Sequence, residues 1–168
     1  MNARRVRLEW AEQTYWMQAA QTFAQLRDAQ TQVSFSGYVV ALRDEAEFAQ
    51  WVGAQGPGKI RLIQRADGVE VQTAVGKVPG PDPEGPTLPA RAGSLSHPSL
   101  QKVLVMLRER FGAEDGIWIV PSFGMPLSAV LSVVRTIGEL PKESRFPYTA
   151  LVFPRPPPQA AGYPSTGR

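Results

Sequence analysis

Apolar and polar positions along the chain recur with the spacings of both helices and strands. In residues 7–30, large apolar residues recur every three or four positions, as on one face of a helix (Tyr15, Trp16, Ala19, Phe23 and Leu26). Residues 33–40 alternate and predict a strand. Asp44 and Glu47 have the spacing of a capping box, which predicts a short helix over residues 44–52. The first third of the chain is therefore expected to form an α-β-α unit.

A β-hairpin is the clearest pattern in the middle of the chain. Residues 59–65 and 69–73 flank Asp67-Gly68, and this dipeptide is the strongest short signal for a hairpin turn. From residue 77 to residue 97 the chain becomes rich in proline and glycine, which favour neither strand pairing nor a continuous helix. We expect a surface loop there, with a polyproline-type ligand for a partner groove as the functional alternative.

Two helices and two strands are expected in the last third. Pro98 and Pro126 each occupy a position typical of a helix start. The apolar faces of these helices are predicted at Leu100, Val103, Leu104, Leu107 and Phe111, and at Leu127, Val130, Leu131, Val134 and Ile137. Residues 116–120 and 148–153 are short apolar runs typical of strands. Because each helix is apolar on one side only, both are expected to cover one sheet.

These elements predict one α+β domain over residues 1–153, with a mainly antiparallel sheet and helices packed on it. The expected order is β-β-α-β-α-β from residue 59, preceded by α-β-α. An alternative partition starts at Val33 and gives a ferredoxin-like sandwich with an added α-β unit. Residues 154–168 are rich in proline and predict a disordered tail.

Composition excludes several kinds of chemistry. The chain has no cysteine and one histidine, which excludes disulfides, thiolate metal sites and any site that needs two imidazoles. A net charge of +3 is too small to indicate nucleic-acid binding by itself. No apolar run approaches the length of a membrane span, and no signal-peptide core follows Arg7. We therefore expect a cytoplasmic protein without a transmembrane segment.

No catalytic, metal-binding or cofactor-binding constellation emerges from the sequence. A Ser-His-Asp set would require His97, whose position beside Pro98 fits helix capping better. Ser122 follows a predicted buried strand, but the first glycine of a G-x-S-x-G elbow is missing there. The acidic residues cluster at a helix start or in loops (Asp44, Glu45 and Glu47; Asp82 and Glu84; Glu114 and Asp115). The chain is therefore expected not to be an enzyme.

Nucleic-acid binding would have to use the predicted hairpin. Arg61 and Arg65 fall on the same face of its first strand, and a sheet that carries arginine and aromatic side chains can stack bases. No aromatic residue lies within the hairpin strands themselves. A polar face in contact with water is therefore the favoured interpretation.

Residues 116–134 read GIWIVPSFGMPLSAVLSVV, a buried strand followed by a short turn and a helix. Together with the β-β-α-β-α-β order, this segment makes residues 59–153 resemble the extracytoplasmic domain of the ExbD/TolR family of biopolymer-transport proteins. The sequence has Pro121-Ser122 where that family usually has alanine and aspartate, and Leu127 where it often has tyrosine. The family's membrane helix has no counterpart in these residues, so its proton-coupled activity is not carried over. The resemblance implies a small module that dimerises or grips a partner.

The leading expectation is a non-enzymatic protein–protein interaction module, either an adaptor or a component of a larger assembly. The alternatives are an auxiliary module of an ExbD/TolR-like envelope machine and nucleic-acid binding through a basic sheet face. If Trp16 faces the core, then Trp10 and Met17 lie on an adjoining flank of the first helix. Exposed tryptophan and methionine are typical of interfaces.

The predicted contact residues are accordingly Trp10, Tyr15 and Met17, and the partner is another protein or a second copy of this chain. The alternative is that the sheet and the long loop bury the first helix on two sides.

Overall fold

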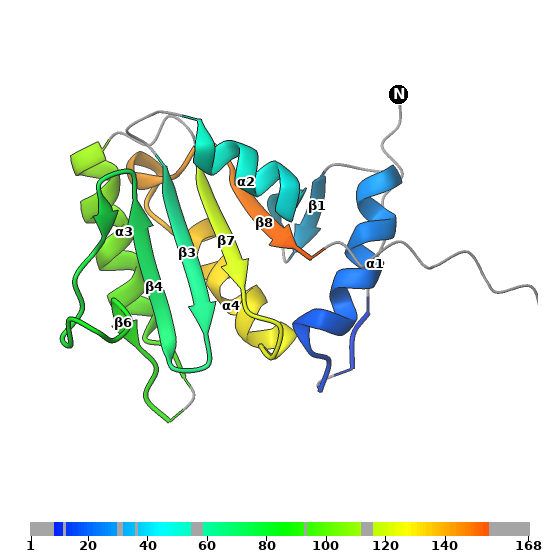
Figure 1. The fold of residues 1–168 in the computed structure, drawn as a ribbon, viewed down its shortest axis with the longest axis horizontal. Coiled ribbons are helices and arrows are strands. Elements are labelled where there is room, and N and C mark those ends of the chain that lie inside the picture. Colours follow the sequence, from blue (N-terminus) through cyan, green and yellow to red (C-terminus); the bar gives the residue numbers. More distant parts are fainter. Residues whose placement is uncertain are drawn as a thin grey trace, which may run out of the picture.

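An eight-stranded sheet organises the computed structural model, which describes residues 9–11, 13–29, 32–35, 37–54, 59–92, 94–111 and 116–154 (Figure 1). The helices are α1 (Trp16–Ala29), α2 (Glu45–Gly53), α3 (His97–Phe111) and α4 (Leu127–Gly138), with a 3-10 turn at Lys142–Ser144. The strands are β1 (Gln32–Phe35), β2 (Tyr38–Asp44), β3 (Ile60–Arg65), β4 (Gly68–Thr73), β5 (Gly76–Lys77), β6 (Leu88–Pro89), β7 (Ile117–Pro121) and β8 (Thr149–Phe153). Among these residues, no helix is long and apolar enough to cross a bilayer.

The pairing of the strands confirms an α+β fold with a mainly antiparallel sheet. The strand order is β1-β2-β8-β7-β3-β4-β5, and β6 also pairs with β4. Of the seven pairings between described strands, four are antiparallel and three are parallel. The parallel pairings join β2, β8, β7 and β3 at the centre of the sheet. The alternative ferredoxin-like arrangement is wrong. It treats β8 as a strand added to a complete sandwich, whereas β8 pairs with both β2 and β7 inside the sheet.

The strand predicted over residues 33–40 is a β-hairpin. Phe35 pairs with Tyr38, so β1 runs antiparallel to β2 and the chain reverses between these two residues. Gly37 has φ +87°, a left-handed conformation that glycine adopts without strain. The Ser-Gly dipeptide is a turn signal that the alternating pattern of the flanking residues concealed.

The first helix is shorter than its apolar spacing predicted. Residues 9–11 and 13–15 are not helical, and α1 begins at Trp16. The backbone of Tyr15 forms an isolated bridge with Pro126, which draws the chain toward the start of α4. Gln18 then supports the helix start, because its side-chain oxygen accepts a hydrogen bond of 3.0 Å from the Tyr15 amide.

The proline-rich segment does pair with the sheet, contrary to the prediction of an unpaired loop. Its strand β6 lies along β4, with Leu88 opposite Val69. The buried Thr87 hydroxyl accepts a hydrogen bond from the Val71 amide (2.9 Å) and donates one to the Val78 carbonyl (2.7 Å). The segment therefore satisfies polar groups on the outer edge of β4, where an uncovered strand would expose them.

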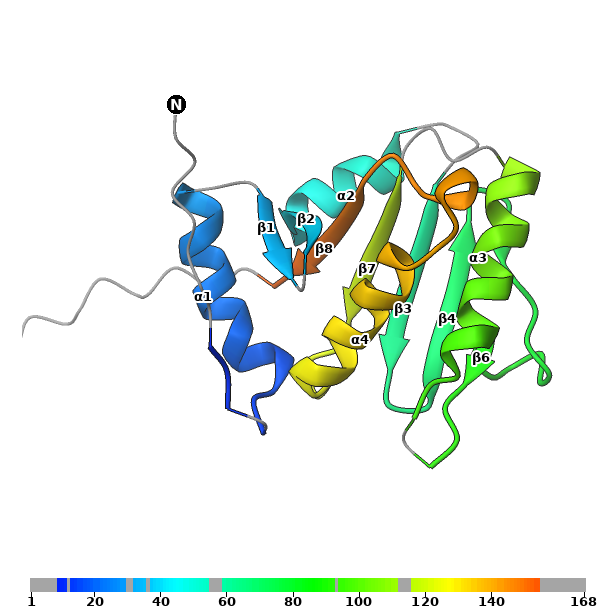
Figure 2. The ribbon, with the colours of Figure 1, turned by 180° about the vertical axis from the view of Figure 1, so that it is seen from behind.

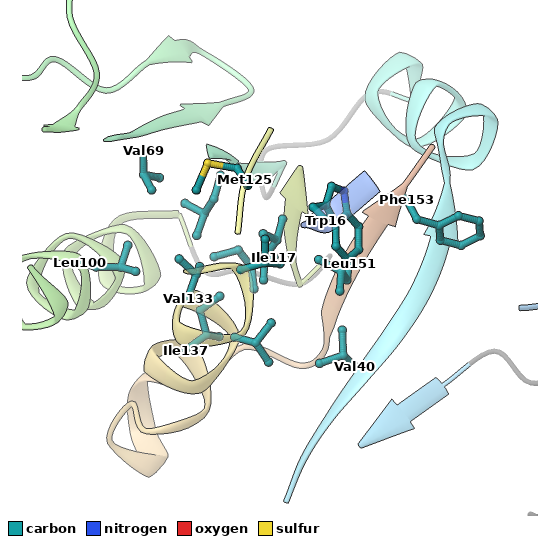
Figure 3. Close-up of a cluster of buried hydrophobic side chains, with 14 of the residues drawn as sticks. Trp16, Val40, Val69, Leu100, Ile117, Met125, Val133, Ile137, Leu151 and Phe153 are labelled. Atoms are coloured by element: carbon teal, nitrogen blue, oxygen red, sulfur yellow. The ribbon is translucent and has the colours of Figure 1, made fainter. Parts of the chain in front are cut away.

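The main core lies between one face of the sheet and the helices α1, α3 and α4, which cover that face (Figure 2). Leu104, Leu107 and Val130 are buried there as predicted, whereas Leu131 is half-buried. Figure 3 shows part of this core, with side chains of α1 and α4 converging on those of β7 and β8. The expected layout of helices stacked on one sheet is therefore confirmed for the described residues.

A second, aromatic core lies on the opposite face under α2. Trp51 of α2 stacks on Trp118 of β7 with their ring centroids 4.7 Å apart, and Phe48 contacts both rings. The Lys59 ammonium lies 4.7 Å from the Trp51 ring centroid, a cation–π contact. The helix α2 thus completes the burial of β7 and β8 on both faces.

The predicted capping box at the start of α2 is confirmed. The Asp44 carboxylate accepts from the Glu47 amide, and the Glu47 carboxylate accepts from the Asp44 amide. Glu47 also binds Arg27 of α1 at 2.7 Å and Arg43 of β2 at 3.3 Å. Burial by itself raises the pKa of Glu47, but the hydrogen bonds from Arg27 and Asp44 and the two arginine charges outweigh it, so the pKa is lowered below 4.5.

The proline-rich tail predicted for residues 154–168 lies, beyond Pro154, outside the described residues.

Replacing Thr87 with valine should destabilise the protein by about 2 kcal/mol, because the buried Val71 amide and Val78 carbonyl lose their hydroxyl partner. Urea unfolding measures the loss. The exposed Glu84, in the same segment, provides the control Glu84→Gln. An unchanged unfolding midpoint in Thr87→Val would show that this segment does not stabilise the edge of β4.

Replacing Glu47 with glutamine should cost roughly 1 kcal/mol at neutral pH, the usual size of a capping and partly exposed ion-pair contribution. A lowered folded-state pKa stabilises the fold above the unfolded-state pKa, and this contribution disappears as the pH falls through the folded-state value. The gap between wild type and variant should therefore close in acid. Thermal unfolding from neutral to acidic pH tests this, with the exposed neighbour Glu45→Gln as control. A gap independent of pH would contradict it.

Candidate functional site

The three predicted contact residues occupy different environments. Tyr15 and Met17 are 51% and 56% exposed. Trp10 is half-buried against the core, with its ring centroid 5.8 Å from that of Phe23. The prediction that Trp10 lies on an exposed flank is therefore wrong. The prediction failed because it placed residue 10 in the helix. The helix begins at Trp16, so helical geometry does not determine the direction of the Trp10 side chain.

Another exposed aromatic side chain lies in the turn before Met125, whose carbonyl accepts a hydrogen bond from the Trp16 amide. Phe123 is 57% exposed and belongs to the turn between β7 and α4. Sequence analysis did not select it, although an apolar residue within a Ser-Phe-Gly turn is a signal of exposure. We call the group formed by Tyr15, Met17 and Phe123 the α1–α4 junction.

Hydrogen bonds hold the backbone of the α1–α4 junction. The Trp16 amide donates to the Met125 carbonyl at 2.7 Å, and the Leu127 amide donates to the Thr14 carbonyl at 2.8 Å. The turn that carries Phe123 is closed by a hydrogen bond from the Met125 amide to the Ser122 carbonyl at 3.1 Å. The starts of α1 and α4 are therefore tied together by backbone hydrogen bonds and lie side by side (Figure 2).

A pocket of about 320 Å³ lies beside the α1–α4 junction. The β3–β4 hairpin, the segment that leads into α3 and the first turns of α4 form its walls. Polar side chains in the lining are Gln64, Arg65, Ser94, His97, Ser128 and Ser132. Met125 and Pro126 also line it, and Pro126 is the bridge partner of Tyr15, so the pocket and the junction share one backbone segment.

A chain of hydrogen bonds fixes His97 at the pocket wall. The Ser132 hydroxyl lies 3.0 Å from His97 Nε2, and His97 Nδ1 is hydrogen-bonded to Thr136 Oγ1. The buried Thr136 hydroxyl donates its own proton to the Ser132 carbonyl at 2.8 Å. The Thr136 hydroxyl proton is used in that bond, so Thr136 Oγ1 accepts from His97 Nδ1–H.

This arrangement differs from the helix-capping role expected for His97. Ser96 caps α3, because its hydroxyl accepts from the Ser99 amide, whereas His97 is the first helical residue and its imidazole joins α3 to α4. Ser132 and His97 have the spacing of a nucleophile and a base. The group that orients His97 is a hydroxyl rather than a carboxylate, so it does not stabilise an imidazolium as the aspartate of a triad does. Ser122, the other serine considered, has no hydrogen bond to this histidine among those found.

The described acidic residues do not form a metal site. No group of three or more histidine, aspartate or glutamate side chains with metal-binding proximity occurs within the described ranges. Asp44 and Glu47 cap α2, and the Asp82 carboxylate accepts from the Glu84 amide in the proline-rich segment. Glu114 and Asp115 lie outside the described residues.

The open face of the β3–β4 hairpin presents arginines that are already hydrogen-bonded or ion-paired. Arg61 Nε donates to the Gln72 side chain at 2.6 Å. Arg65 lies 3.6 Å from the Glu70 carboxylate. The neighbouring strand contributes Trp118 in register with Arg61, but this ring is buried under α2. These contacts give no specific support to a base-stacking surface.

Comparisons with protein-family models, with curated proteins and with solved structures find no match to this chain.

Replacing Trp10 with alanine should lower the free energy of unfolding by about 1–3 kcal/mol, because a half-buried ring is removed from its contact with Phe23. Met17→Ala, the matched control on the exposed surface, should change it by less than about 0.5 kcal/mol. Chemical denaturation followed by circular dichroism distinguishes the two. Equal losses for both variants would contradict the different environments of these side chains.

Proposed function

We propose that this chain is a non-enzymatic protein–protein interaction module that binds its partner through the α1–α4 junction. The observation that carries the proposal is the exposure of three large apolar side chains, each more than half accessible, at one hydrogen-bonded end of the fold. Single exposed apolar residues are common on protein surfaces, whereas grouped ones indicate interaction sites.

The residue types of the junction suit a binding surface. Aromatic side chains bury a large area at a small entropic cost, and methionine adapts to varied partner shapes. Because the backbone beneath them is already ordered, little conformational entropy is lost on binding. We therefore expect Tyr15, Met17 and Phe123 to provide most of the binding energy.

The favoured partner is another protein that presents an apolar segment to the junction. A second copy of this chain is the alternative partner, in which case two junctions would face each other about a two-fold axis. The two cases differ in whether the purified chain associates with itself.

The auxiliary module of an ExbD/TolR-like envelope machine remains a second candidate function. It is supported by the element order over residues 60–153, in which a hairpin and the two short strands β5 and β6 are followed by a helix, a strand, a second helix and a last strand. The two helices also cover the same face of the sheet (Figure 2). Whether the reading frame or a neighbouring gene encodes a membrane helix would discriminate between this candidate and a free-standing adaptor.

Replacing Met17 and Phe123 together with alanine should weaken partner binding or self-association by at least about tenfold, because their exposed area is lost from the contact. The control pair is Val75→Ala and Met106→Ala, which are exposed elsewhere on the fold. Sedimentation velocity measures self-association of the purified chain. Affinity capture with quantitative mass spectrometry compares the recovery of each partner by wild type, variant and control.

Selective loss in the junction variant, with an unchanged melting temperature, supports the proposal. Equal recovery and equal self-association in all three proteins would overturn it.

A further inference from the structure

We propose that the pocket between the β3–β4 hairpin and α4 binds a small molecule that carries a carboxylate or phosphate on a compact apolar body. This site is independent of the α1–α4 junction as a contact surface, because Tyr15, Met17 and Phe123 are not part of its lining. Its volume of about 320 Å³ lies at the lower end of the range for small-molecule sites.

Arg65 carries the permanent charge of the pocket lining, which contains no aspartate or glutamate. Arg65 is paired with Glu70 only at 3.6 Å and its side chain is more than half exposed, so its guanidinium retains donors for a second acceptor. A guanidinium binds carboxylate and phosphate groups through charge-assisted hydrogen bonds.

Helix termini add to the same electrostatic preference. His97 is the first residue of α3, and Ser128 is the second residue of α4. The N-terminal ends of both helices, which carry partial positive charge, therefore lie at the wall of this pocket. An anionic group is therefore favoured there over a neutral group of the same shape.

Hydroxyl groups supply further hydrogen bonds without adding charge. Ser94, Ser128 and Ser132 line the pocket, and Ser132 is held in place by its contact with His97 at 3.0 Å. The Ser132 hydroxyl can turn from His97 Nε2 toward a ligand oxygen, because a hydroxyl rotates freely about its C–O bond. This would give the oxyanion a donor that is already positioned.

The rest of the lining determines the body of the ligand. Val69, Leu95, Met125 and Val133 contribute apolar surface to the pocket. A ligand that is charged throughout would leave these side chains without a complementary partner. The walls therefore favour one oxyanion at the end of a small apolar group, such as an aromatic or short branched carboxylate.

Titration with benzoate, followed by ¹H–¹⁵N correlation spectra at constant ionic strength, tests the proposal. The backbone amides of Gly68, Ala129 and Ser132 should shift, with a dissociation constant on the order of 1 mM for so small a probe. Benzamide is the matched control ligand, because it has nearly the same shape without the charge. Inorganic phosphate, titrated separately, reports whether an oxyanion without the apolar body also binds.

Variants identify the groups that recognise the anion. Arg65→Gln should weaken benzoate binding roughly tenfold, because a charge-assisted hydrogen bond is lost. Arg61→Gln is the matched control, since it removes an arginine from the same strand but outside the lining. Ser132→Ala should also weaken binding, and its melting temperature shows whether losing the His97 contact disturbs the fold.

The expected result is a benzoate response at the lining amides that benzamide does not reproduce and that Arg65→Gln diminishes more than Arg61→Gln. Phosphate shifts at the same amides support the oxyanion as the recognised group. Equal responses to benzoate and benzamide, shifts confined to other residues, or no response to either oxyanion would overturn the proposal.

Discussion

The fold depends on the burial of β7 and β8 on both faces. Their side chains alternate between the main core and the aromatic core under α2, so neither face of these strands meets water over most of its length. A strand in this position must also satisfy its backbone groups on both edges. The parallel partners β2 and β3 do this, and with α2, α3 and α4 they enclose the centre of the sheet (Figure 1).

This central constraint also positions the candidate sites. Because β7 runs parallel to β3, the turn after β7 emerges beside the end of β3, and α4 begins there. The Ser122 amide donates to the Gln64 carbonyl at 2.8 Å, which fixes that turn to the end of β3. Ligand sites in sheets with parallel strands commonly lie beyond the carboxyl ends of those strands. Here both the pocket and the α1–α4 junction lie at that end.

The hydrogen-bonded contacts in this region have two consequences for function. Those between α1 and α4 order the backbone under the exposed side chains, which reduces the entropy lost on docking. The contact of His97 with Ser132 and Thr136 joins α3 to α4 and orders one wall of the pocket. Binding surfaces built on such elements are more precise than surfaces on isolated loops. The two proposed sites are nevertheless separate, since they share the Met125–Pro126 backbone but not their exposed side chains.

Local patterns were sufficient where the decisive interaction is local. The capping box of α2 lies within four residues, the Asp67-Gly68 turn lies within the β3–β4 hairpin, and the apolar face of α4 follows from helical spacing alone. Exposure of Met17 also followed from the helical angle to Trp16, because both residues belong to α1. In each case the separation of the residues along the sequence determines where they lie in space.

The sequence by itself therefore determined the class of the fold, most elements and the apolar faces of the last two helices. Only the tertiary structure decided that β8 lies between β2 and β7, that β6 covers the edge of β4 and that Trp10 packs on Phe23. It alone brought His97 to Ser132, which is 35 residues away along the chain. The physical reason is that these contacts join segments whose local patterns are compatible with several arrangements. The choice among them follows from burying one shared core and pairing every strand edge, which no local stretch of sequence specifies.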